Sequence, residues 1–276
     1  MNMNKKILVI GAKGMLGSDL CSLLEKEPNH NIISWGINQL DITNKQENAK
    51  IINCKPDMII NCAAYTNVDL AETEKDKCYS INVAGVENLC ITAKQIGSLL
   101  IHISTDYVFD GKKNGYIESE KTNPLNWYGK TKAEGEEIIR TMLNDYYILR
   151  TSWLFGNHGK NFIKTITKIA NEKKEIKVVN DQIGCPTYTK DLAEKINEFI
   201  ATNPQHGIYH TTNSGFCSWY DFAKEIIEKQ NIDCKVMPCT TKEVPRPAIR
   251  PAYSILLNTK TKLMRPWKEA LENYLK

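Results

Sequence analysis

Short apolar runs alternate with stretches of helical spacing over the first 150 residues of the chain. Residues 7–10 form a continuous apolar run that ends at a glycine, which is typical of a strand buried in a parallel sheet. Leucines then recur three and four residues apart, as on one face of an amphipathic helix, at Leu16, Leu20, Leu23 and Leu24. The same patterns predict further strands within residues 31–37, 56–66, 99–111 and 145–156. Helices are expected within residues 41–54 and 78–97 and after Pro124.

Strands that alternate with helices predict βαβ units. The expected fold is therefore α/β, a Rossmann-type doubly wound parallel sheet with helices on both faces. After about residue 153 the alternation loosens and the turns become richer in proline. We expect a dinucleotide-binding domain over residues 1–152 and a smaller C-terminal α/β substrate-binding domain over residues 153–276, with some later segments packing back on the sheet.

Composition narrows the class of protein. The chain has 276 residues, of which 42% are hydrophobic, and this is enough to bury a full core. Its net charge of +4 is mild and no lysine- or arginine-rich block occurs, so no nucleic-acid or membrane partner is expected. The first apolar run is too short for a signal peptide, and no stretch reaches the roughly 18–20 apolar residues of a membrane span. The sequence therefore predicts a cytoplasmic protein.

Nine cysteines are scattered along the chain without a C-x-x-C pair. This pattern indicates reduced, mostly buried thiols rather than a disulfide framework or a zinc site.

Three glycines separate the first predicted strand from the first predicted helix. Gly11, Gly14 and Gly17 give the spacing G-x-x-G-x-x-G. Glycine allows a tight turn and a close approach of backbone to a pyrophosphate, and the helix N-terminus that follows offers unpaired N–H groups. A turn that merely uses glycine is the alternative, but the position directly after a buried strand favours a dinucleotide site.

The second predicted strand ends without a carboxylate to bind the ribose 2′-hydroxyl of NAD. The first acidic residue after it is Asp41, and Lys13 is close enough in sequence to attract a 2′-phosphate. We therefore expect NADPH rather than NADH, with NADH still possible. Asp41 or Thr43 is also a candidate N-cap for the helix predicted over residues 41–54.

Tyr128 and Lys132 are four residues apart and would share one face of a helix. A phenol titrates near pH 10, and an ammonium group one turn away favours its ionised form. Ser104 and Thr105 follow a buried strand at its carboxyl end, where open parallel sheets place their ligands. Each feature has a plain alternative, surface decoration for the pair and capping for the hydroxyls. Their occurrence together in this order favours a catalytic set.

The order of these motifs resembles that of the extended short-chain dehydrogenase/reductases that act on nucleotide sugars. The glycine loop is followed by "NCAAYT", "STDYVFDG" and Tyr-x-x-x-Lys. In detail the chain is similar to the dTDP-4-dehydrorhamnose reductase family, in segments such as "PLNWYGKTKAEGE", "VVNDQIGCPTYTKDLA" and "RPAIRPAYSILLNT". These segments extend nearly end to end, so the resemblance covers both expected domains.

The resemblance implies a reaction at a nucleotide-sugar substrate. NAD(P)H would reduce the C4 keto group of dTDP-4-dehydro-L-rhamnose to dTDP-L-rhamnose. Tyr128 would donate the proton, Lys132 would hold the nicotinamide ribose and lower the tyrosine pKa, and Thr105 would hydrogen-bond the carbonyl oxygen.

The resemblance also implies binding residues. Besides Tyr128 and Lys132, the cofactor would contact Gly11, Gly14, Met15, Leu16, Gly17, Asp41, Ile42, Ala64, Tyr65, Thr66 and Ile103. The sugar would contact Thr105, Asp106 and Trp153, although Trp153 could equally be a core aromatic. Arg250 could meet the diphosphate or pair with a carboxylate. The segment with Gln182 and Thr187 resembles a substrate loop, and Gly-Cys-Pro within it is also ordinary turn chemistry.

Metal and oligomeric state stay open at this stage. Some members of the family bind Mg²⁺ at a dimer interface through glutamates. Here Asp19 follows the glycine loop, and no complete set of ligands is recognisable. Mg²⁺ is therefore possible, the metal-binding residues are unknown, and the chain could be a monomer or a homodimer.

Two other functions compete with this reading. One is a 4-ketoreductase of another nucleoside-diphosphate deoxysugar, because Asp106 and Trp153 would suit several 6-deoxyhexoses. The other is a non-catalytic regulatory subunit resembling that of methionine adenosyltransferase. The intact Thr105, Tyr128 and Lys132 set argues against a regulatory subunit, which needs no proton donor.

Overall fold

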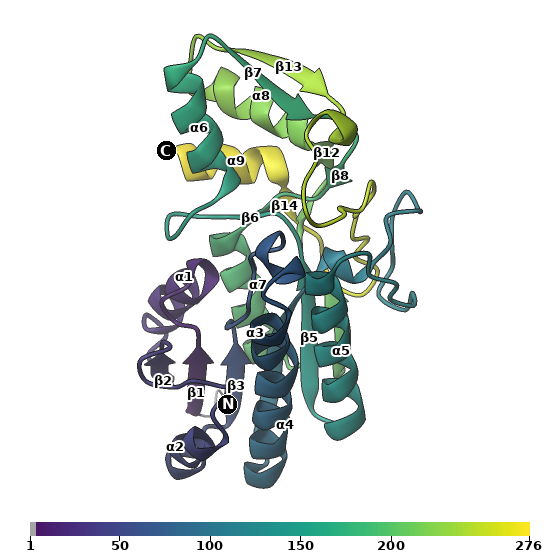
Figure 1. Cartoon of the computed structure of the whole chain (residues 1–276). Coiled ribbons are helices and arrows are strands. Elements are labelled where there is room, and N and C mark those ends of the chain that lie inside the picture. Colours follow the sequence, from purple (N-terminus) through teal and green to yellow (C-terminus); the bar gives the residue numbers. More distant parts are fainter. Residues whose placement is uncertain (1–3) are drawn as a thin grey trace.

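The computed structural model describes residues 4–276. Its larger unit, the lower one in Figure 1, is built on a six-stranded sheet with the order β10-β5-β4-β3-β1-β2, in which every neighbouring pair is parallel. The strands are β1 (Lys5–Ile10), β2 (His30–Trp35), β3 (Met58–Asn61), β4 (Leu99–Thr105), β5 (Tyr146–Thr151) and β10 (Gly207–His210). The predicted doubly wound parallel sheet is confirmed.

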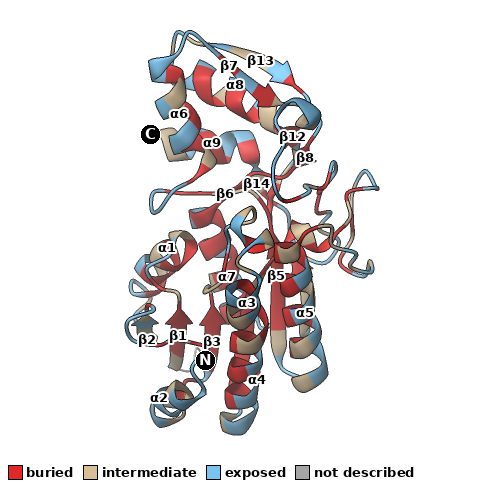
Figure 2. Cartoon of the chain, viewed as in Figure 1, coloured by how far each residue is buried: buried red, intermediate tan, exposed pale blue. Residues whose placement is uncertain are grey.

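Helices cover both faces of this sheet because its strands are apolar on both sides. Alternate residues of β1 enter different cores, Ile7 and Val9 on one face and Leu8 and Ile10 on the other. The first face packs against α1 (Met15–Leu24) and α7 (Thr189–Thr202). The second packs against α2 (Asn48–Cys54), α4 (Gly85–Ile96) and α5 (Trp127–Met142). Figure 2 shows the central strands as almost entirely buried.

A smaller α/β unit lies at one end of the sheet (Figure 1). It contains a parallel pair of strands, β7 (Glu175–Val179) and β13 (Lys235–Cys239). Three helices pack with them around a separate hydrophobic core: α6 (Phe162–Glu172), α8 (Trp219–Lys229) and α9 (Trp267–Leu275). This is the smaller C-terminal unit that the sequence predicts. Two elements of the large sheet layer, α7 and β10, also come from beyond residue 152.

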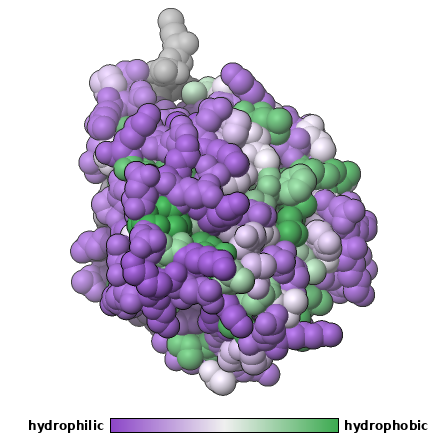
Figure 3. Space-filling view, turned by 90° about the horizontal axis from the view of Figure 1, so that it is seen from above, coloured by the Kyte–Doolittle hydropathy of each residue, from purple (hydrophilic) through white to green (hydrophobic). Residues whose placement is uncertain are grey.

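Three pairs of strands, each two or three residues long, join the two units. They are β6 (Leu154–Phe155) with β9 (Thr187–Tyr188), β8 (Ile183–Gly184) with β12 (Cys217–Ser218), and β11 (Asn213–Ser214) with β14 (Met264–Pro266). Viewed from the end that carries the smaller unit, the surface is mainly hydrophilic, with apolar side chains in separate patches (Figure 3). Within residues 4–276, no helix has the length and apolar character needed to cross a membrane.

Two of the helices predicted from the sequence differ from the structure in how they begin. The predicted helix at 78–97 is α3 (Lys75–Tyr79), a π-helical turn (Ser80–Ala84) and α4 in succession. The predicted N-cap at Asp41 or Thr43 is wrong, because Asn44 caps a 3-10 turn (Lys45–Glu47) that leads into α2. The Asp41 carboxylate instead accepts the backbone N–H of Thr43 at 2.9 Å. Short polar side chains compete for such local bonds, so spacing alone does not fix the cap.

A buried ion pair ties α5 to the sheet. The Glu136 carboxylate accepts hydrogen bonds from Arg150 at 2.6 and 2.9 Å, and the Ser104 hydroxyl donates to it at 2.5 Å. Glu136 and Arg150 are each only 2% exposed. Because both charges have left water, each depends on the other for its solvation.

Removing one member of this pair should destabilise the protein strongly. We expect Glu136→Gln to lower the free energy of unfolding by about 3–5 kcal/mol, because the Arg150 charge stays buried without its partner. Urea denaturation measures the change. Glu137→Gln on the same helix is the control: Glu137 pairs with Arg140 at the surface, and its loss should cost less than about 1 kcal/mol. Equal effects of the two substitutions would contradict this account.

Candidate active site

The glycine loop is shaped by close backbone contacts. Gly11 has a φ of +75°, and a Cβ there would lie 2.7 Å from the backbone nitrogen of Ala63. A Cβ on Gly17 would overlap the carbonyl oxygen of Gly11. Gly14 is the N-cap of α1 and supplies no side-chain cap, so the N–H groups of the first turn are left for another acceptor. The loop therefore fits a pyrophosphate.

A cleft of about 520 Å³ opens beside this loop. It lies where β2 and β3 depart to opposite sides of β1, the switch point at which doubly wound sheets bind ligands. Residues that follow all three strands line it, among them five predicted cofactor contacts: Gly11, Gly14, Asp41, Ile42 and Ala64. The residues present fit a dinucleotide.

The other predicted cofactor contacts lie next to the cleft rather than in its lining. Met15, Leu16 and Gly17 form the first turn of α1, where Leu16 joins the core. Tyr65 is buried, its N–H donates to Asn82 at 2.9 Å and its hydroxyl to Glu74, whereas Thr66 is exposed. Ile103 contributes its carbonyl oxygen to a bond with Lys132.

Lys13 of the glycine loop lies beside the end of β2, and no acidic residue directly follows that strand. Lys13 is exposed, lines the cleft, and has side-chain carbons 3.3 Å from where a Cβ of Gly36 would stand. Asp41 also lines the cleft, but its Oδ1 already accepts from the backbone N–H and the hydroxyl of Thr43. The charge at this corner therefore favours an anion.

Lys132 is buried at the inner end of α5. Its Nζ donates to the carbonyl of Ile103 at 2.8 Å and lies 2.9 Å from Nε2 of His102. The side chain is only 2% exposed, and this burial lowers the pKa of Lys132 to about 8. Its charge is therefore lost at a lower pH than that of an exposed lysine.

Tyr128 lies one turn before Lys132 on the same helix, beside the end of β4. Burial raises the pKa of its phenol above the ordinary value, and the nearby Thr105 hydroxyl opposes that rise in part. Tyr107 packs edge-on against it, with ring centroids 5.9 Å apart. The phenol therefore stays protonated at neutral pH, as a proton donor must.

Thr105 and Asp106 stand together at the carboxyl end of β4. The Thr105 hydroxyl donates to Oδ1 of Asp106 at 3.0 Å. Oδ2 of Asp106 is buried and makes no hydrogen bond with any residue that the structure describes. Burial raises the pKa of Asp106 to about 7. Ser104 faces the other way, toward Glu136, so only the threonine of the pair belongs to the site.

Trp153 lies where the two units meet. Its backbone has a φ of +48°, an unusual value for a bulky residue, and its ring stacks on Trp219 with centroids 3.6 Å apart. Gly184 lies against the same ring, since a Cβ there would come within 2.5 Å of it. Trp153 is only partly buried, so it combines core packing with an accessible portion.

Other sequence candidates have partners within the protein. Arg250 binds Asp69 through two bonds of 2.6 and 2.9 Å, which is the carboxylate pairing that the sequence left open. Gln182 donates to Thr241 at 2.9 Å, and Thr187 is fully buried.

Asp19 is buried and accepts from the Thr189 hydroxyl at 2.5 Å, so it links α1 to α7. Within residues 4–276, no three His, Cys, Asp or Glu side chains are grouped as a metal site would require.

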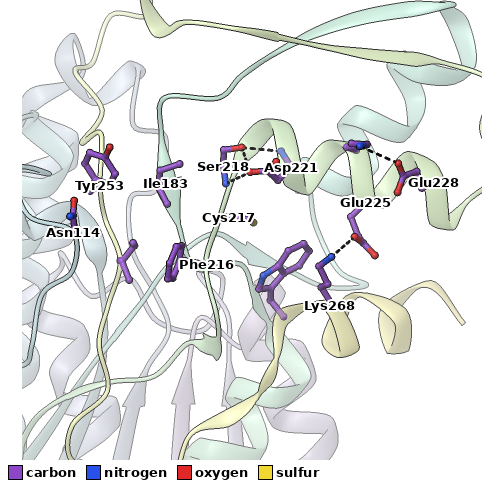
Figure 4. A pocket seen from close by; sticks show the side chains of 13 residues that line it. Asn114, Ile183, Phe216, Cys217, Ser218, Asp221, Glu225, Glu228, Tyr253 and Lys268 are labelled. Carbon is purple, nitrogen blue, oxygen red and sulfur yellow. Dashed lines mark hydrogen bonds and ion pairs between the residues drawn. The ribbon is translucent and has the colours of Figure 1, made fainter.

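A second cavity, of about 820 Å³, lies beside α8 and α9 of the smaller unit, reaches Asn114 from the first 152 residues, and contains none of the predicted site residues (Figure 4). Its charged groups are engaged with one another. Asp221 completes a capping box with Ser218 at the start of α8, and Glu225 pairs with Lys268 at 2.9 Å. Phe216 and Tyr253 are exposed at its edge. No catalytic group is arranged here.

Sequence reasoning missed two residues of the site, His102 and Asn61. Both are polar positions inside otherwise apolar runs, "LLIHIST" and "DMIINCA". They face each other on adjacent strands, with Asn61 Nδ2 and His102 Nδ1 3.1 Å apart. A buried polar residue in a central strand is a signal in itself, because it needs a partner.

Known proteins share this architecture over almost the whole chain. The model of the RmlD substrate binding domain matches residues 5–276. A dTDP-4-dehydrorhamnose reductase from Aggregatibacter actinomycetemcomitans is 42% identical, with 97% of each chain covered. The chain belongs to the dTDP-4-dehydrorhamnose reductase family.

Solved structures of this family superpose closely on the chain. The family member from Clostridium acetobutylicum has a TM-score of 0.94 at 45% identity, covering 98% of each chain. The member from Bacillus anthracis, solved in complex with NADP, has a TM-score of 0.95 at 40% identity, covering 99% of each chain. The resemblance that the motifs indicated is confirmed.

The family's Tyr-x-x-x-Lys helix approaches its neighbours closely at two glycines. A Cβ on Gly129 would overlap the carbonyl oxygen of Tyr107, and one on Gly135 would lie 2.5 Å from the carbonyl oxygen of Asn82. The helix therefore packs on backbone at these points, and this contact sets the depth of Tyr128 and Lys132.

Gly129→Ala should test that contact. Alanine normally stabilises a helix interior by about 1 kcal/mol relative to glycine, whereas the clash predicts destabilisation by about 1–3 kcal/mol. Chemical denaturation gives the sign. Lys130→Ala, at the next and exposed position, is the control and should change stability by less than about 0.5 kcal/mol. A stabilised Gly129→Ala protein would refute the close packing.

Proposed function

We propose that the protein reduces the C4 keto group of dTDP-4-dehydro-L-rhamnose to give dTDP-L-rhamnose, with NADPH as the reductant. NADPH, when bound, would supply the hydride that C4 receives. The observation that carries the proposal is the buried Tyr128–Lys132 pair at the end of β4, next to Thr105 and one strand away from a dinucleotide-shaped cleft.

Tyr128 would act as the general acid. Hydride arrival at C4 leaves negative charge on the carbonyl oxygen, which then takes the phenol proton. Lys132, one turn further along α5, would stabilise the phenolate that results and would hold the nicotinamide ribose. Its ammonium form serves this role, so activity should fall as pH rises through about 8.

Thr105 and Asp106 would hold the sugar. The Thr105 hydroxyl hydrogen now goes to Asp106, and in the complex it would turn to the carbonyl oxygen of the substrate. The free Oδ2 of Asp106 would then accept a sugar hydroxyl. Trp153 would offer an apolar ring surface to the deoxysugar.

In this proposal the two units differ in which ligand they contact. Every residue that lines the dinucleotide cleft lies between positions 10 and 81, within the predicted domain 1–152. The sugar nucleotide would lie against the predicted domain 153–276, which contributes Trp153 and its support Trp219. The chain would act as a monomer or as a homodimer. We place the reaction in the cytoplasm, where the nine free cysteines stay reduced.

Tyr128→Phe tests the proton donor. Loss of general acid catalysis should lower kcat by about 10²–10⁴-fold, with substrate affinity little changed. The assay follows absorbance of the reduced nicotinamide. Tyr146→Phe is the matched control, because Tyr146 begins β5 at the end of the sheet opposite to the site, and it should keep wild-type kcat. Undiminished turnover by Tyr128→Phe would contradict a role for Tyr128 as the general acid.

The substrate is tested by a panel of 4-keto sugar nucleotides, with and without Mg²⁺. Fastest turnover of dTDP-4-dehydrorhamnose supports the proposal. Preference for another nucleoside-diphosphate deoxysugar would assign the protein to that ketoreduction instead. Absence of turnover with every substrate would favour the regulatory subunit.

Lys13 should set the preference for NADPH. A charge-assisted contact with a 2′-phosphate is worth about 1.5–3 kcal/mol, so Lys13→Ala should raise KM for NADPH by about 10–100-fold and leave KM for NADH nearly unchanged. Lys94→Ala, an exposed lysine on α4 away from the cleft, controls for net charge. Equal changes for both cofactors would rule out a role at the 2′-position.

A further inference from the structure

Three buried polar side chains form a line that ends at Lys132. Asn61 on β3 and His102 on β4 are directly paired across the sheet, and His102 in turn reaches Lys132 on α5. Asn61 and His102 are each 1% exposed and Lys132 is 2% exposed. Because water is excluded, each hydrogen-bond donor along this line must meet an acceptor within the protein.

The direction of the line is fixed at its outer end. Oδ1 of Asn61 accepts the backbone N–H of Ala63 at 3.0 Å. The other end of the amide, Nδ2, therefore points at His102 and can only donate. Nδ1 of His102 must accept, so in the neutral ring the hydrogen is on Nε2.

That hydrogen points at Nζ of Lys132 across 2.9 Å. An uncharged amine has a lone pair that accepts it, and its own N–H groups remain free to donate to the Ile103 carbonyl at 2.8 Å. An ammonium group has no lone pair, so two donors would face each other. Turning the Asn61 amide over to relieve this would set its NH₂ against the Ala63 N–H.

The surroundings supply no compensating negative charge in direct contact. Glu136, the nearest carboxylate on α5, is held by Arg150 and Ser104. Cys62 after β3 and Cys78 on α3 also face the lysine, and burial raises the pKa of both thiols, so they stay neutral. Tyr128 on α5 is neutral for the same reason. Burial also keeps the pKa of His102 well below its usual range.

We propose that Asn61 and His102 are positioning residues that lower the affinity of Lys132 for its proton, so that the ammonium form is lost at a lower pH than it would be without them. Asn61 selects the Nε2–H tautomer of His102, and that N–H donates to Nζ. The lysine is thereby held at a fixed place and binds its proton weakly. The consequence for catalysis rests on the proposed function: the pH at which Lys132 loses its charge, and with it the support of Tyr128, is lowered beyond the effect of burial by two residues that do not line the dinucleotide cleft.

The tautomer is measured directly in the wild-type protein. Long-range ¹H–¹⁵N spectra of imidazole-labelled protein at pH 9 distinguish the two neutral forms. The chain has five histidines, so the signals are few, and His102→Gln identifies the relevant set by its loss. The expected result is the Nε2–H form. An Nδ1–H form or a charged ring would overturn the proposal.

The lysine is followed by titration of its ¹³Cε signal, assigned with Lys132→Arg. In His102→Gln the glutamine oxygen can accept from an ammonium, so the Lys132 titration should move up by about one pH unit or more. His206→Gln is the control, because His206 pairs with Asp145 at 3.0 Å away from this line, and it should leave the titration in place. An unchanged titration in folded His102→Gln overturns the proposal.

Turnover supplies a separate readout. The alkaline limb of the kcat profile should move upward in His102→Gln together with the lysine titration. If the wild-type protein reduces no sugar nucleotide, the proposed function fails, while the tautomer and the titration still decide this inference. If turnover is normal but the tautomer is Nδ1–H, the inference alone fails.

Discussion

Burial of a lysine beside a tyrosine on one face of α5 is the constraint on which the rest of the site depends. A lysine taken out of water loses the solvation of its charge, so its surroundings decide whether it stays charged. The helix reaches the required depth because Gly129 and Gly135 let it lie on the backbone of Tyr107 and Asn82. Glycine costs a helix about 1 kcal/mol at each such position, and close packing offsets that cost.

The sheet provides the other half of the arrangement. Its strand order opens a cleft at the ends of β1 and β3, while β4, the next strand, carries Thr105 and Asp106 to the same edge. A cofactor bound in the cleft would therefore end beside Tyr128, the proposed proton donor. The pair of Glu136 and Arg150 lies further along α5 and fixes that helix against β5. Helix α5 and strand β4 therefore carry both residues that stabilise the fold and residues that are proposed to act in catalysis.

Buried polar groups in this region cost the fold stability, but they determine the proton affinities of the residues in the site. A network in a low-dielectric interior is favourable only when every donor meets an acceptor. Around Lys132 this condition is met by the amine and not by the ammonium, given the way Asn61 is held. The same burial that keeps Tyr128 protonated makes Lys132 easy to deprotonate. Burial therefore raises the pKa of Tyr128 and lowers the pKa of Lys132.

The sequence by itself determined the parallel sheet, the glycine loop and the Tyr128–Lys132 face, because these follow from spacing within a few residues. It also carried the family motifs nearly end to end. Only the tertiary structure decided which hydroxyl of Ser104 and Thr105 enters the site, since adjacent strand residues point to opposite faces and the packing of α5 chose between them. The pairing of Asn61 with His102, and of His102 with Lys132, joins residues 41 and 30 positions apart. Such contacts depend on strand order and helix depth, which no local pattern encodes.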